Sequence, residues 1–172
     1  MISRSEFLGL TAAIAASSAV AAQNAPSAAE LEAEARKNTP HKSETIMAMD
    51  EAGLVRILKD QRSTDFEKAK ACQRLAVVGG ETAVPALAAL LPDPKLSHYA
   101  RYALEAMPGP ESDAALRGAL GKLNGNLLIG VVNSIGRRKD TEAVQALAKL
   151  RHDADRNVAE AAAAALAEIR RT

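Results

Sequence analysis

From residue 50 onward, apolar and polar positions alternate along the chain with the period of an α-helix. In the stretch 96–107, apolar residues recur every three or four positions, which places them on one helix face; they are Leu96, Ala100, Ala103, Leu104 and Met107. A similar stripe precedes it and consists of Phe66, Ala69, Cys72 and Ala76. The period predicts helices over residues 50–60, 65–78, 82–91, 96–107, 112–122, 126–136, 141–151 and 156–170.

The predicted helices form a unit that repeats about every thirty residues. Three helix-turn-helix units cover 65–94, 95–124 and 125–155, and 156–170 is one further first helix. A glycine or proline, which ends helices, follows each of the three first helices; these residues are Gly79, Pro108 and Gly136. Such a period is the signature of stacked helix pairs. We therefore expect an all-α fold wound as a right-handed superhelix.

Equivalent positions in successive helices predict the core. The residues expected to be buried are Leu75, Leu87, Leu104, Leu116, Ile135, Leu147 and Leu166. Local signals agree with the helix assignment, since Thr64 and Glu67 have the spacing of a capping box. Pro85 falls in the first turn of its helix, where the missing N–H costs little.

Four stretches of the repeats resemble a known family. They are 71–79 (ACQRLAVVG), 83–87 (AVPAL), 95–105 (KLSHYARYALE) and 131–136 (VVNSIG). These stretches resemble the short HEAT-like repeats named after phycobilisome linker-lyase proteins, and in particular a module of exported bacterial HEAT-repeat proteins. The resemblance implies a solenoid of the HEAT or armadillo type, a fold whose members mostly bind other proteins. Fold alone, however, does not determine function.

Composition supports helices and excludes several classes of protein. The chain of 172 residues contains 38 alanines but only two tyrosines, two phenylalanines and no tryptophan. Alanine favours helices, whereas sheets favour β-branched and aromatic residues. A net charge of +1 gives no field that would attract nucleic acid or an anionic membrane. The single cysteine excludes an internal disulfide framework and any cysteine-rich metal site. We expect a monomer.

The first 22 residues predict a secretory signal peptide. A short charged start, an apolar stretch over 7–16 and small residues up to Ala22 follow one another in the required order. The apolar stretch is too short to span a bilayer. Residues 3–8 (SRSEFL) resemble the twin-arginine export motif with Ser5 in place of the second arginine, so the export route stays open. An ordinary exposed helix is the alternative interpretation.

These features predict three segments and a location. Residues 1–22 are the signal peptide, 23–45 a poorly packed tether and 46–172 the HEAT-like repeat domain. The mature protein is expected in the periplasm or the external medium, with no membrane insertion after signal cleavage.

No strong catalytic, metal-binding or nucleotide-binding motif occurs in the sequence. The patterns His-Glu-x-x-His, Cys-x-x-Cys, Gly-x-Ser-x-Gly and the Walker loop are all missing. Gly118 and Gly121 have the wrong spacing for a phosphate loop, and we interpret them as packing glycines within a helix. Metal-binding relatives in the family that the chain resembles use His-Glu pairs, and none of the three histidines precedes a glutamate. We therefore predict no catalytic residue, metal or cofactor.

Cys72 has two interpretations. The only thiol of an exported protein can attach a cofactor or pair with another chain. Cys72 also lies on a predicted apolar stripe, where a thiol behaves as a small buried hydrophobe. The stripe favours the structural role.

One segment concentrates side chains that are typical of recognition sites. Residues 97–102 (SHYARY) contain both tyrosines; His98, Arg101 and Glu105 are expected to face outward, with the tyrosine rings beside the apolar stripe. Tyrosine and arginine are enriched at binding hot spots. The predicted partner-binding residues are Arg74, His98, Tyr99, Arg101, Tyr102, Asn133, Arg137 and Arg138.

Structural explanations exist for the same residues. The tyrosine rings can fill gaps in an alanine-rich layer, and Arg101 can pair with Glu105 one turn later. Arg137 and Arg138 follow a predicted helix end, where cations interact favourably with the helix dipole.

Two classes of function follow from these observations. The first is an exported, non-enzymatic scaffold that binds another protein, or an accessory subunit of an exported complex. The second is a chromophore-lyase-like enzyme or enzyme subunit, which would need a deep pocket lined by Tyr102, His98 and Cys72.

Overall fold

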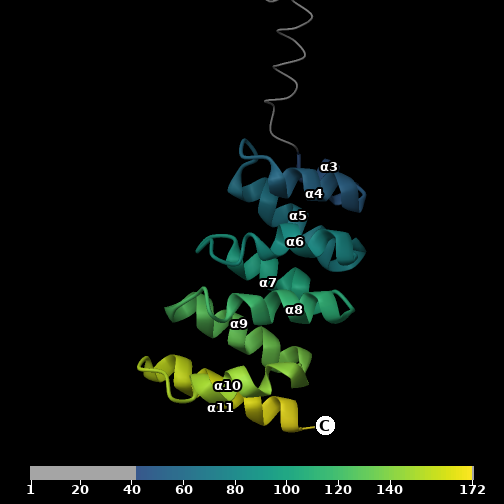
Figure 1. The fold of residues 1–172 in the computed structure, drawn as a ribbon. Coiled ribbons are helices and arrows are strands. Elements are labelled where there is room, and N and C mark those ends of the chain that lie inside the picture. Colours follow the sequence, from purple (N-terminus) through teal and green to yellow (C-terminus); the bar gives the residue numbers. More distant parts are fainter. Residues whose placement is uncertain (1–41, 172) are drawn as a thin grey trace, which may run out of the picture. The chain divides into compact units, whose positions relative to one another are not determined.

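The computed structural model describes residues 42–171 (Figure 1). The predicted signal peptide and most of the predicted tether lie outside the described residues. Within residues 42–171 every regular element is a helix, either α or 3-10, and no strand is present. Among these helices, none is both long enough and apolar enough to cross a membrane. The prediction of an all-α chain is confirmed for this part of the protein.

The elements are α3 (Ser43–Met47), α4 (Glu51–Lys59), α5 (Asp65–Val78), η1 (Glu81–Ala83), α6 (Val84–Ala88), α7 (Ser97–Ala106), α8 (Pro110–Ala119), α9 (Gly125–Arg138), η2 (Thr141–Ala143), α10 (Val144–Leu150) and α11 (Arg156–Arg170). A helix is present in each of the eight predicted ranges. The helices α6 and α10 are shorter than predicted, because the 3-10 turns η1 and η2 precede them. Helix α3 was not predicted, and it begins within the range expected to be a tether.

The helices pack as two layers, stacked in chain order (Figure 1). Helices α3, α5, α7, α9 and α11 form one layer, in which each contacts the next. Helices α4, α6 and α8 form the second layer in the same way, and α10 packs against α11. Contacts between the layers join α4 to α5, α6 to α7 and α8 to α9. In the first two predicted units the first helix therefore belongs to one layer and the second helix to the other.

The core lies between these two layers. All seven predicted core positions, from Leu75 to Leu166, are buried. Ile46 adds α3 to the same core, with no exposed surface. The assignment of Phe66 to a core stripe is wrong, because its side chain is 55% exposed. The buried positions of α5 are instead Glu67, Ala71, Cys72 and Leu75.

Several helices begin at polar residues whose side chains cap the first turn. Thr64 accepts a hydrogen bond from the backbone N–H of Glu67, whose carboxylate in turn accepts one from the Thr64 N–H at 2.8 Å. This reciprocal pair is the predicted capping box, and it satisfies two donors that a helix start leaves free. Asp50 and Asp155 cap α4 and α11 through side-chain oxygens. Pro85 lies in the first turn of α6, as expected.

The glycines of α8 and α9 have different roles from those predicted. Gly136 does not end α9, which continues to Arg138 and stops at Lys139 in the left-handed conformation, with φ of 54°. A Cβ at Gly136 would lie 2.9 Å from Ala165 Cα, so glycine is needed for α11 to approach α9. At Gly118, by contrast, a Cβ would meet no atom within 4 Å. Gly118 therefore has no packing role.

Candidate protein interface

The first helices α5, α7 and α9 carry their more exposed side chains on the side away from the second layer, where Lys70 and Gln73 are half-buried. Helices α5, α7 and α9 are buried on the side that faces the second layer, and each exposes the opposite stripe. We call these stripes together the first-helix face; its residues are Phe66, Lys70, Gln73 and Val77 of α5, His98, Tyr102 and Ala106 of α7, and Asn133 and Arg137 of α9. Residues three or four apart on a helix share a face, which accounts for these spacings.

Large apolar side chains are concentrated on this face. Among the described residues, four large hydrophobic side chains are exposed, and three of them belong to the first-helix face. Phe66 and Tyr102 are each 55% exposed and Val77 is 75% exposed; Met47 of α3 is the fourth. Of these three, only Tyr102 was among the predicted partner-binding residues. Phe66 and Val77 stand about three turns apart on one stripe of α5, a signal that was obscured because alanines occupy both sides of this helix.

The tyrosines and the histidine of α7 lie where the sequence predicts. His98 and Tyr102 are exposed, and Tyr99 is half-buried against the core. The rings of His98 and Tyr99 meet edge to face, with centroids 5.5 Å apart. Because Tyr99 packs against the core, Tyr102 is the tyrosine of α7 that is open to a partner.

Arg101 does not face outward, contrary to the prediction. Its side chain is 19% exposed and crosses to α9, where it donates hydrogen bonds to Gly130 O at 3.1 Å and Ser134 Oγ at 3.2 Å. A Cβ at position 130 would lie 2.7 Å from Arg101 Nε, so glycine at this position makes room for the guanidinium. Burial lowers the pKa of Arg101, while the nearby Glu105 carboxylate opposes that shift. Arg101 thus joins two helices of the first layer.

Glu105 is surrounded by donors from α9. Ser134 Oγ donates to one carboxylate oxygen at 2.6 Å, and Arg137 Nη1 donates to the other at 3.0 Å. Arg101 lies 3.8 Å from the same carboxylate. Arg137 remains 72% exposed, so most of its guanidinium is still available to another molecule.

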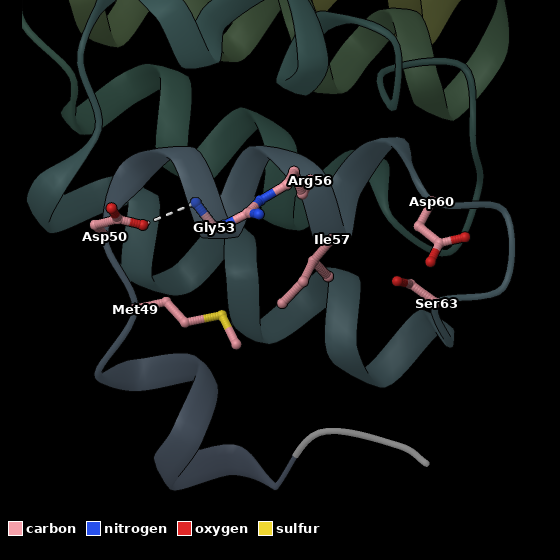
Figure 2. Close-up of a pocket in the computed structure, with 7 residues that line it drawn as sticks. All are labelled: Met49, Asp50, Gly53, Arg56, Ile57, Asp60 and Ser63. Atoms are coloured by element: carbon pink, nitrogen blue, oxygen red, sulfur yellow. Dashed lines mark hydrogen bonds between the residues drawn. The ribbon is translucent and has the colours of Figure 1, made fainter. Parts of the chain in front are cut away.

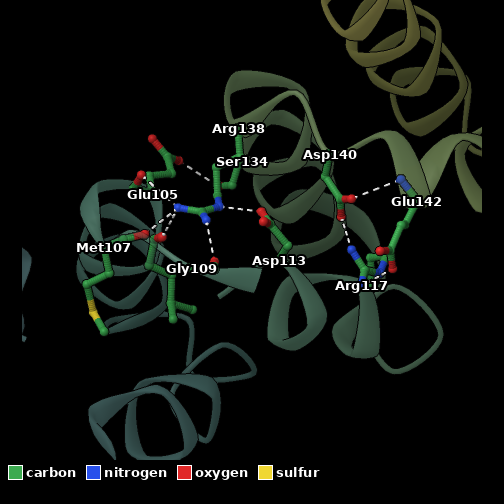
Figure 3. A network of polar contacts seen from close by, with 10 residues as sticks. Glu105, Met107, Gly109, Asp113, Arg117, Ser134, Arg138, Asp140 and Glu142 are labelled. Atoms are coloured by element: carbon green, nitrogen blue, oxygen red, sulfur yellow. Dashed lines mark hydrogen bonds and ion pairs between the residues drawn. The ribbon is translucent and has the colours of Figure 1, made fainter. Parts of the chain in front are cut away.

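Arg138 is a structural residue rather than a surface residue. Its side chain is 10% exposed and lies against the carboxyl end of α7 (Figure 3). The guanidinium donates to four backbone oxygens, Leu104 O at 2.8 Å, Glu105 O at 3.1 Å, Met107 O at 2.7 Å and Gly109 O at 3.0 Å. It also pairs with Asp113 of α8. The prediction that Arg138 binds a partner is therefore not supported by its position.

A second buried ion pair lies next to this network and was not predicted. Asp140, which is buried, accepts from Arg117 of α8 and from the backbone N–H of Glu142, and so caps η2 (Figure 3). Arg117 also pairs with Glu142 at 2.7 Å. The hydrogen bond to Asp140 raises the pKa of Arg117. These contacts fix the second unit on the third.

A hollow of about 400 Å³ between α9 and α11 adjoins the first-helix face. Its lining residues are Asn133, Gly136, Arg137, Ala164, Ala165 and Glu168. Two predicted partner-binding residues, Asn133 and Arg137, therefore lie at its edge. Arg74, another predicted residue, is half-buried on α5, and its Nε is buried without a hydrogen-bond partner.

A further hollow of about 370 Å³ lies beside α4 (Figure 2). The two carboxylates that line it accept hydrogen bonds from backbone N–H groups. Asp50 accepts from Gly53 N and Asp60 accepts from Arg62 N, both at 2.9 Å. The hydrogen bond from Arg62 N lowers the pKa of Asp60. A smaller, apolar hollow of about 210 Å³ lies between α6 and α8. Within residues 42–171, no group of His, Cys, Asp and Glu side chains is arranged to hold a metal ion.

Cys72 is a core residue. It has no exposed surface, and burial raises the pKa of its thiol to about 12. The pocket expected for a chromophore lyase would bring Cys72 together with His98 and Tyr102. Those two side chains are exposed on α7, and none of the three hollows described above is lined by any of these residues.

Comparison with known proteins does not extend this description. No protein-family model matches the chain, and no curated protein matches it significantly.

Proposed function

We propose that this protein is an exported, non-enzymatic scaffold or accessory subunit of the HEAT-like type, in which the stacked helix pairs form a right-handed superhelix. It binds another protein through the first-helix face. Residues 1–22 act as the signal peptide that directs the chain to the periplasm or beyond, and the mature protein is a monomer. The observation that carries this proposal is the exposure of Phe66, Val77 and Tyr102 on one face of adjacent helices.

The energetic argument concerns these three side chains. Fully burying a large apolar side chain contributes about 1.5–3 kcal/mol, so three of them can supply a substantial part of a binding free energy. Aromatic residues lose few rotamers when they bind and are enriched at hot spots. Stacked repeats are suited to this use, because successive units place equivalent positions side by side on one surface.

Exposure supports four of the predicted residues as members of the proposed interface. Tyr102, Asn133 and Arg137 remain, together with His98. Arg101 and Arg138 are assigned to the junction between α7 and α9 instead. Tyr99 and Arg74 are half-buried and lie at the margin of the face.

The test is affinity capture with the full chain from extracts of cells that make it, followed by calorimetry with the purified partner. Tyr102→Ala should weaken binding more than tenfold, which corresponds to about 1.4 kcal/mol. Met47→Ala is the matched control, because Met47 is also an exposed apolar residue but lies on α3, which is separated from α7 by α5 in the same layer. Equal affinity of both folded variants for the partner would refute the assignment of the interface.

A further inference from the structure

We infer that the segment bound by the first-helix face is an acidic stretch of protein that carries large apolar side chains. This inference rests on the proposed function and adds the chemistry of the partner. It follows from the charges of α5, α7 and α9 and from the neighbours of each charged group.

Every carboxylate of these three helices already accepts a hydrogen bond or forms an ion pair within the chain. Asp65 pairs with Lys95 at 2.9 Å. Glu67 is buried in the capping box at the start of α5. Glu105 receives hydrogen bonds from Ser134 and Arg137. The first-helix face therefore offers a partner no carboxylate that lacks a donor.

Two cations of the same face are accessible to a partner, of which Lys70 is half-buried and Arg137 is exposed. Lys70 donates to Gln73 at 3.1 Å and lies 5.8 Å from the centre of the Phe66 ring; among the described residues, no ion pair neutralises its ammonium group. Arg137 uses one guanidinium nitrogen for Glu105, and the side chain is otherwise exposed. A guanidinium presents five donors in a planar fork that fits a carboxylate, so Arg137 can bind a second acid.

The apolar and cationic groups lie on adjacent helices of one layer. Tyr102 and Glu105 are three residues apart on α7 and so lie on neighbouring positions of one helix face. Glu105 is hydrogen-bonded to Arg137, and Arg137 lines the hollow between α9 and α11. On α5, Lys70 stands one turn from Phe66. A segment that buries the rings of Phe66 and Tyr102 thus brings its own acidic side chains next to Lys70 and Arg137.

Other occupants fit these observations less well. Nucleic acid is bound by several cations at once. Arg101 and Arg138 are not available for this, because they form contacts within the fold, and the net charge of the chain is only +1. A second copy of the chain, bound through the same face, would bring no carboxylate without a donor to Lys70 or Arg137, because the face has none.

The experiment uses two labelled synthetic peptides with leucine and phenylalanine at helical spacing, one with glutamate and one with lysine at all other positions. Fluorescence anisotropy with the full chain should show at least tenfold tighter binding of the acidic peptide. Raising sodium chloride from about 0.1 M to about 1 M, which shortens the Debye length from about 10 Å to about 3 Å, should weaken that binding.

Charge reversal supplies the specific test. Arg137→Glu should weaken binding of the acidic peptide at least tenfold, whereas Arg156→Glu makes the same change at an exposed arginine of α11 and should leave it unaltered. Tighter binding of the basic peptide, equal effects of the two variants, or equal competition by a DNA duplex would overturn the inference. Capture of a cellular partner that Tyr102→Ala releases and Arg137→Glu retains would leave the proposed function standing and refute only the acidic chemistry.

Discussion

The neighbouring residues Arg137 and Arg138 offer a direct test of how the repeats are held together. Both lie at the carboxyl end of α9, yet one side chain is 72% exposed and the other 10% exposed. Arg138 donates to four backbone oxygens, two in the last turn of α7 and two in the α7–α8 connection, and it pairs with Asp113. We therefore expect that replacing each arginine with methionine, which keeps much of the apolar stem, will have very different effects.

The magnitudes follow from burial. Removing one partner of a buried ion pair costs about 3–5 kcal/mol, because the other charge is left without compensation. Arg138→Met has this effect on Asp113 and also leaves four carbonyl oxygens without their donor. Arg137 makes a single exposed contact to Glu105, and such pairs contribute about 0–1 kcal/mol. Since a typical domain is stable by only about 5–15 kcal/mol, the Arg138 variant should lose a large part of its stability.

Urea denaturation followed by circular dichroism measures the difference. With a slope of about 2 kcal/mol per molar urea, Arg138→Met should lower the midpoint by about 2 M, and Arg137→Met by less than about 0.5 M. A double-mutant cycle with Asp113→Asn should show that much of the loss is shared between the two residues. Similar midpoints for the two methionine variants would show that the Arg138 contacts contribute nothing to stability.

Three further predictions concern the core, the glycines and the thiol. Leu104→Ala, at a position with no exposed surface, should cost about 2–5 kcal/mol; an unchanged melting temperature would contradict the assigned register. Gly118→Ala should stabilise the protein by about 0.5–1 kcal/mol through helix propensity, whereas Gly136→Ala should destabilise it by about 1–3 kcal/mol through the clash with Ala165, and denaturation showing the same sign for both would refute this contrast. Because burial raises the pKa of Cys72 from 9.0 to about 12, the folded state keeps its proton while the unfolded state loses it, so stability should fall by up to about 1.4 kcal/mol per pH unit between these values. Cys72→Ala should lack that part of the decline, and parallel pH profiles of the two proteins would disprove it.

The helices and most of the core follow from the sequence because their causes are local. Leu104 and Leu116 are identified by the helical period, and Thr64 by its spacing from Glu67. Phe66 was assigned to the wrong side of α5 because alanines flank both sides of that helix and weaken the contrast between its faces. Helix α3, with five residues, is too short for a period to be detected.

The roles of Arg101 and Arg138 are not predictable from local pattern. A helical wheel gives the direction in which a side chain leaves the helix, but a long arginine can turn back along its neighbour. Its acceptors here are mostly backbone oxygens, which have no sequence signature. One signal was present, since Gly130 interrupts the apolar run 127–132 of α9, where glycine costs about 1 kcal/mol relative to alanine. A glycine in that setting indicates that another group approaches closely.

The contacts of Arg138 and Arg117 limit how the number of repeats can change. Each of these arginines links the second unit to the third through groups that only the adjoining unit supplies. Deleting the segment 95–124 would therefore remove Arg117 and leave both Arg138 and Asp140 without partners, and duplicating it would leave a second set of partners empty. At the junction between the first two units, Lys95 and Asp65 form an exposed ion pair instead. Losing an exposed ion pair of this kind changes the free energy of unfolding little. Gain or loss of a unit during evolution is thus better tolerated before α7 than after it.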